Sequence, residues 1–116
     1  MTIRIKRVYE APAPDDGWRA LVDRLWPRGI KKADLEMDEW AKDVAPSADL
    51  RRAWHHGDIS DGAFRERYAV ELDGNPALAE LAEKARTGTV TLLVATRDVA
   101  TSHAHVLADA IERTRP

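Results

Sequence analysis

The chain has 116 residues, of which 44% are hydrophobic and 33% charged, and this composition predicts one globular domain over residues 1–116. The formal net charge is −2, so any binding of nucleic acid or anionic lipid requires a local basic patch. The absence of cysteine excludes disulfides, thiolate metal ligands and a cysteine nucleophile, and it fits a reducing compartment. No apolar run is long enough to span a membrane and the N-terminus lacks a signal-peptide pattern, so we expect a cytoplasmic protein.

Three or four β-strands are expected. Residues 2–7 alternate apolar and charged side chains, which is the pattern of a half-buried strand. A second strand is predicted over residues 18–25, ended by Pro27. Residues 37–44 fit either a helix face or a strand, and we favour a short strand. Residues 90–95 are apolar, β-branched and barely alternating, so they predict a central strand covered on both faces.

Helices dominate the second half of the chain, where apolar residues recur at helical spacing behind residues that favour N-caps. The predicted caps are Ser47, Ser60, Asn75 and, for the last helix, Thr101 or Ser102. Strands followed by helices, then one more strand and a final helix, predict an α/β domain. We expect a mixed or mostly parallel sheet of three to four strands with helices packed around it.

Several strings of the sequence resemble one bacterial protein family. They include residues 3–10, 21–29, 40–47 and 64–72, and the most specific is Asp23-Arg24-Leu25-Trp26-Pro27-Arg28-Gly29. On these strings the chain resembles the DUF488 family and, within it, the short YeaO-like proteins. The resemblance implies an α/β fold in a cytoplasmic bacterial protein, and it implies no reaction, because the family has no assigned function. The family more often has lysine where Arg97 stands and asparagine where Ser102 stands.

Polar clusters follow the predicted strands, at the end of the sheet where α/β proteins bind ligands. If the strands are parallel, the clusters at 23–28, 46–47 and 96–98 converge. Arginine presents forked donors that suit phosphate or carboxylate, and the N-terminus of the last helix adds free backbone N–H groups. The sequence therefore predicts an anion-binding cleft built on Arg24, Arg28, Arg97 and Asp98. The expected ligand-binding residues are Asp23, Arg24, Trp26, Arg28, Arg97 and Ser102.

Proton transfer in such a cleft would fall to Asp98 or His103, so these are the candidate catalytic residues. No metal and no cofactor is expected, because the sequence has neither zinc-ligand spacing nor a glycine-rich phosphate loop. A structural alternative stays open for every arginine, which can pair with a nearby carboxylate and brace the fold. Whether the chain is an enzyme is therefore left undecided by the sequence.

A second function from a different class also fits. The basic patch from Arg24 to Lys32 suits a non-catalytic regulatory or stress-related module that binds nucleic acid or a protein partner. Trp26 could stack on a base there, or it could serve only in packing. A small anionic ligand is favoured over nucleic acid as the partner, no membrane partner is expected, and the oligomeric state is not predicted.

Overall fold

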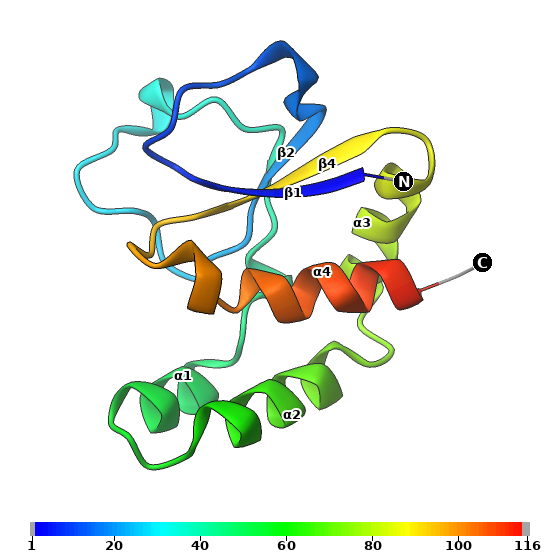
Figure 1. The fold of residues 1–116 in the computed structure, drawn as a ribbon. Helices are drawn as coiled ribbons and strands as arrows, with labels where there is room; N and C mark the ends of the chain where they lie inside the picture. The colour runs from blue at the N-terminus through cyan, green and yellow to red at the C-terminus, as the bar shows by residue number, and fades with distance from the viewer. Residues whose placement is uncertain (1, 115–116) are drawn as a thin grey trace.

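The computed structural model, drawn as a ribbon in Figure 1, describes residues 2–114. The strands form one four-stranded sheet. Its strands are β1 (Thr2–Arg7), β2 (Trp18–Leu21), β3 (Glu39–Trp40) and β4 (Thr89–Val94). They lie in the order β1-β4-β2-β3, and every pairing between them is parallel. The α/β class is confirmed, and of the two expected forms of the sheet the parallel one is present.

Strand β4 occupies the centre, as its apolar sequence predicts. It pairs with β1 on one side, from Thr2 opposite Thr89 onward, and with β2 on the other. The five residues from Val90 to Val94 are all buried. A strand with neighbours on both sides and cover on both faces has no solvent-facing positions, which explains why it lacks the alternation seen in β1.

The helices are α1 (Ala48–His55), α2 (Asp61–Leu72), α3 (Pro76–Arg86) and α4 (Ala104–Arg113). Three of the predicted caps are confirmed. The side chains of Ser47, Ser60 and Asn75 each accept a hydrogen bond from a backbone N–H in the first turn of α1, α2 and α3 respectively, at 3.2, 3.1 and 2.8 Å.

The expected cap of the last helix is wrong. Neither Thr101 nor Ser102 caps α4, whose N-cap is His103 and whose first turn receives no side-chain hydrogen bond. A short 3-10 helix (Val99–Thr101) stands between β4 and α4 and is capped by Asp98 instead. This extra turn puts the N-cap of α4 two residues beyond Thr101 and one beyond Ser102, the two hydroxyl residues that were expected to cap it.

The four helices lie on one side of the sheet, with α3 and α4 next to the strands, and irregular segments cover the other side (Figure 1). In Figure 1, α1 and α2 form a hairpin that packs against α4 on the side away from the sheet. The helical side holds the larger core, which includes Phe64, Tyr68, Leu92 and Leu107. The opposite side holds a smaller cluster under the chain segments that follow β1 and β2. Its buried members are Val8, Leu21, Leu35 and Leu93.

An ion cluster fastens the segment before β2 to the loop-covered face. Asp16 is 1% exposed, and its carboxylate accepts hydrogen bonds from the backbone N–H of Ala13, from Lys6 and from Arg19. Its own carbonyl accepts one from the Thr91 hydroxyl at 2.7 Å. Burial raises the pKa of Asp16, but these hydrogen bonds and the nearby cations outweigh it and hold the pKa below its usual value. The carboxylate is therefore charged in the folded protein.

Strand β2 is shorter than expected, because it ends at Leu21 and not at residue 25. Beyond it, the Val22 N–H still donates to the Leu93 carbonyl at 3.1 Å, but the next contact is made by a side chain. The carboxylate of Asp23 accepts the Ala95 N–H at 2.8 Å. A side chain thus takes the place of a backbone partner, and the chain turns away from the sheet at this point.

Candidate functional site

A cleft of about 630 Å³ lies beyond the C-terminal ends of β2 and β4. Its walls come from the segment after β2, the start and body of α1, the segment after β4 and the residues before α4. This volume is in the range of small-molecule sites, and the position is where parallel α/β sheets bind ligands. The lining includes six of the eight site residues predicted from the sequence: Asp23, Arg24, Trp26, Arg28, Ser102 and His103.

Another cavity of similar volume, about 650 Å³, lies where α2 and α4 end and α3 begins. Its lining is mostly small and apolar, with Arg113 and Asp73 as its charged residues. It gathers no cluster of cationic or acid–base side chains. We therefore regard the cleft at the end of the sheet as the candidate site.

Three arginines line this cleft. The guanidinium group of Arg24 donates to the carbonyls of Pro46 at 3.1 Å and Ala45 at 3.3 Å, which fixes its position without neutralising its charge. Arg28 and Arg51 line the cleft as well. Within residues 2–114, none of the three arginines forms an ion pair with a carboxylate. The structural alternative of bracing by ion pairs thus does not account for them.

His103 is held against the end of β2. Its Nε2 lies 2.9 Å from the Val22 carbonyl and 3.6 Å from a carboxylate oxygen of Asp23. Burial lowers the pKa of His103, the Val22 carbonyl and Asp23 act against this, and the charge of Arg51 lowers it further. The ring is neutral near pH 7 and donates its Nε2–H to the carbonyl, which leaves Nδ1 as an acceptor.

An unsatisfied hydroxyl lies beside the N-terminus of α4. Ser102 is 8% exposed and lines the cleft, and within residues 2–114 its Oγ has no hydrogen-bond partner. The first N–H groups of a helix have no partner inside it; in α4 the His105 N–H donates to the Ser102 carbonyl at 3.4 Å, and no side chain caps the first turn. Buried polar atoms are nearly always paired, so the unpaired hydroxyl of Ser102 is an exception among the described residues.

An aromatic wall closes another side of the cleft. Trp54 of α1 stacks on Phe64 of α2, with ring centroids 3.8 Å apart and planes 13° apart. The indole N–H of Trp54 donates to Asp61 at 2.8 Å, which fixes the ring's orientation. Both aromatic residues line the cleft. The site therefore combines cationic donors with a rigid apolar surface.

Trp26 lines the cleft but is held mainly by packing. Its indole N–H donates to the Ile30 carbonyl at 2.6 Å, and its ring meets Trp40 edge to face at a centroid distance of 5.4 Å. The ammonium group of Lys32 lies 5.9 Å from the centre of the Trp26 ring. These contacts make Trp26 part of the smaller core, in agreement with the packing role considered for it.

Arg97 and Asp98 do not line the cleft. Both are exposed, and they follow β4 on the stretch that leads into the 3-10 helix. A carboxylate oxygen of Asp98 accepts the Ala100 N–H at 3.1 Å, so this side chain caps its own turn instead of reaching the cleft. The two residues were expected to form half of the anion site, and they have no place in it here.

Arg51 and Trp54 of α1 also line the cleft, and neither is among the site residues predicted from the sequence. Trp54 follows Arg51 by three positions on α1, so the two side chains share one face of the helix. That shared face is the signal that pairs a cation with an aromatic ring, but the sequence does not show which way the face points.

No helix within residues 2–114 is long and apolar enough to cross a membrane. Over the same range, no group of three or more histidine and acidic side chains is arranged to hold a metal ion.

Comparisons with known proteins place the chain in a family. It is 51% identical over 106 residues to uncharacterized protein Rv3073c of Mycobacterium tuberculosis, covering 91% of this chain and 90% of that protein. It is 46% identical over 110 residues to uncharacterized protein YeaO of Escherichia coli, covering 94% and 96% respectively. No solved structure matches. The family model described as the inactive DUF488-N3 subclade matches residues 2–115, and the chain therefore belongs to the DUF488 family.

Proposed function

We propose that the protein binds a small ligand bearing a phosphate or carboxylate group in this cleft and does not transform it. The observation that carries the proposal is that Arg24, Arg28 and Arg51 line one cleft, while none has a carboxylate partner within residues 2–114. Guanidinium groups bind phosphate and carboxylate through parallel hydrogen bonds. A bound anion supplies the negative charge that no carboxylate of the described residues brings to these three arginines.

The local structure supports such binding in two ways. Arg24 is already fixed by the carbonyls of residues 45 and 46, so little side-chain freedom is lost when a ligand arrives. Asp23 is the one carboxylate in the lining, and its Oδ2 accepts the backbone N–H of Ala95. The Asp23 carboxylate therefore holds the backbone at the end of the sheet, while the three arginines supply positive charge to the cleft.

A binding role without catalysis has separate support. Of the two candidate acid–base residues, Asp98 lies outside the cleft lining, and the Nε2 of His103 is engaged by a carbonyl. The subclade whose model matches this chain is described as inactive. A metabolite ligand and a sequence without cysteine both fit the cytoplasm, where we place the protein.

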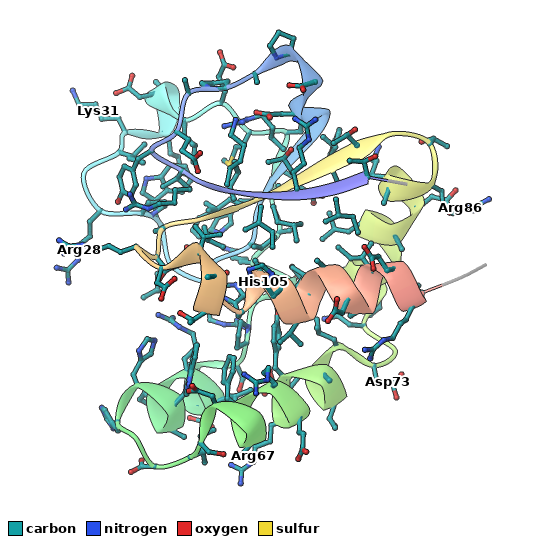
Figure 2. All side chains as sticks on the ribbon, viewed as in Figure 1. Arg28, Lys31, Arg67, Asp73, Arg86 and His105 are labelled. Atoms are coloured by element: carbon teal, nitrogen blue, oxygen red, sulfur yellow. The ribbon has the colours of Figure 1, made fainter. Side chains whose placement is uncertain are left out.

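The second function, binding of nucleic acid or a protein partner through the basic patch from Arg24 to Lys32, keeps one supporting observation. Arg28 and Lys31 are exposed and project from the same side of the molecule (Figure 2). Phosphate contacts on an open surface weaken steeply with salt, whereas a small anion held in a cleft responds less. Affinity for a short RNA or DNA that falls more than about tenfold between 50 and 200 mM salt, with no binding of small anions, would favour this second function.

The test is calorimetric titration of the protein with inorganic phosphate and citrate. Arg51→Gln removes one cation of the cleft, and its neighbour Arg52→Gln is the matched control, since Arg52 is exposed and pairs with Asp49 outside the lining. Loss of a charged hydrogen bond should weaken binding roughly tenfold or more in the first variant, with no change in the second. Failure of both anions to bind, or equal effects of the two variants, would contradict the proposal.

A further inference from the structure

The cleft contains a subsite whose donors converge at the start of α4. Ser102, whose Oγ has no hydrogen-bond partner within residues 2–114, and His103, the N-cap of α4, both line the cleft there, and the first turn of α4 has no side-chain cap. Arg51 lines the same cleft, and its charge lowers the pKa of His103, which is the N-cap of α4. Residues that carry a hydroxyl, a helix N-terminus and a guanidinium group thus line one cleft, each supplying a donor or a positive charge.

This set of donors suits a phosphate monoester better than a carboxylate. A phosphate monoester carries close to two negative charges near pH 7 and offers three acceptor oxygens. A carboxylate carries one charge on two oxygens, and it would leave donors of this subsite without partners. The N-terminus of a helix is also a common phosphate site, because its N–H groups and its dipole both favour the anion.

The aromatic wall adds a second subsite next to the first. Trp54 follows Arg51 by three positions on α1, and side chains at this spacing are neighbours on one helix face. Phe64 supports the ring of Trp54 from one side, and Asp61 holds its indole N–H. Such a fixed ring loses little freedom when a flat group stacks on it, so the wall suits a planar heterocycle.

From these two subsites we propose that the ligand is a nucleoside monophosphate. Its phosphate binds at Ser102, the N-terminus of α4 and Arg51, and its base stacks on Trp54. The cleft volume of about 630 Å³ accommodates a molecule of this size. This inference rests on the proposed function and narrows it to one class of anion.

The experiment compares ligands that contain only one of the two groups with ligands that contain both. The protein is titrated with AMP, GMP, CMP and UMP, with ribose 5-phosphate, which lacks the base, and with adenosine, which lacks the phosphate. Stacking of a base on one aromatic ring strengthens binding roughly fivefold to 150-fold. At least one nucleotide should therefore exceed ribose 5-phosphate by that factor, and adenosine should bind at least about tenfold more weakly than AMP.

Variants assign the two groups to their subsites. Trp54→Leu should remove the advantage of the nucleotide over ribose 5-phosphate and leave the affinity for ribose 5-phosphate unchanged. Trp54→Phe should keep most of that advantage and provides a folded aromatic comparison if the leucine variant proves unstable. Ser102→Ala should weaken both phosphate-bearing ligands by the same factor.

The failures of the two proposals are distinguishable. If ribose 5-phosphate binds and no nucleotide binds more tightly, the nucleotide inference is overturned while the anion site stands. If adenosine binds as well as AMP, the phosphate subsite is refuted. If none of the phosphate-bearing probes nor inorganic phosphate binds, both the inference and the proposed function are overturned.

Discussion

Asp16→Asn tests how the loop-covered face is held in place. The substitution keeps the side chain's shape but removes its charge, so the guanidinium of Arg19, whose side chain is 8% exposed, loses its buried counter-ion. Breaking a buried pair in this way costs about 3–5 kcal/mol. The side chains of Lys6 and Arg4 are 17% and 41% exposed, so solvent screens the interaction of these two cations with the Asp16 carboxylate. Arg19 also keeps its bond to the Glu36 carbonyl. We therefore expect Asp16→Asn to lower the free energy of unfolding by about 3 kcal/mol, the lower end of the range for a broken buried pair.

Urea unfolding followed by circular dichroism measures this loss. With a slope of about 1–3 kcal/mol per molar, a loss of about 3 kcal/mol lowers the midpoint by roughly 1–3 M. Adding Arg19→Met removes the unpaired charge, so the double variant should be more stable than Asp16→Asn alone. A loss below about 1 kcal/mol in the single variant, or a double variant that is less stable still, would refute the reasoning.

Acid adds an independent check on the same carboxylate. The pKa of Asp16 is held below its usual value by the hydrogen bonds described above, in spite of its burial. In the folded state it therefore binds fewer protons than in the unfolded state, and its contribution is fully present above pH ~4. That contribution is lost as the pH falls through the depressed pKa. The acid-induced decline of the free energy of unfolding should consequently be shallower in Asp16→Asn than in the natural sequence.

Three further predictions concern other parts of the fold. Because burial lowers the pKa of His103, the unfolded chain binds the proton more readily than the folded protein. The free energy of unfolding should therefore fall as the pH drops below about 6.5. Urea midpoints at several pH values should show that His103→Gln flattens this pH dependence and that the exposed control, His105→Gln, keeps it. At Gly17, with φ +66°, an added Cβ would lie 2.2 Å from a backbone oxygen of β4, whereas at Gly74, with φ +74°, nothing lies within 4 Å. Gly17→Ala should therefore lower the melting temperature well beyond the effect of Gly74→Ala, for which only the strained φ costs about 1–2 kcal/mol; equal effects would contradict the close approach. Tyr68→Phe removes a buried hydrogen bond to a backbone carbonyl and should cost about 1–2 kcal/mol in the free energy of unfolding, and an unchanged midpoint would show that this bond contributes nothing.

The parts of the fold that depend on local chemistry were predictable from the sequence. Ser47, Ser60 and Asn75 mark three helix starts because a cap bonds to its own first turn, a few residues away. The end of β2 was not predictable, because it is set by a contact between Asp23 and Ala95, which are 72 positions apart. No local pattern encodes that distance.

The candidate site divides in the same way. The string from Asp23 to Arg28 and the residues before α4 meet because parallel strands end at one edge, and that inference needs only the strand directions. The side chains of Arg97 and Asp98 were misplaced because the turn that follows β4 directs one of them to its own backbone. Trp54 and Arg51 enter the cleft because the α1–α2 hairpin packs against α4, a tertiary contact that the helical pattern alone does not specify.

The central position of β4 also governs the order in which the sheet can assemble during synthesis. Thr2 pairs with Thr89, and β1 and β2 are joined to each other only through β4. Until residues 89–94 have emerged from the ribosome, the strand that lies between β1 and β2 is missing, so these two strands cannot join one sheet. The three helices in the middle of the chain can already form local turns by then. Such distant pairings slow folding and leave strand edges exposed on the way, so the nascent chain depends on its last strand to close the sheet.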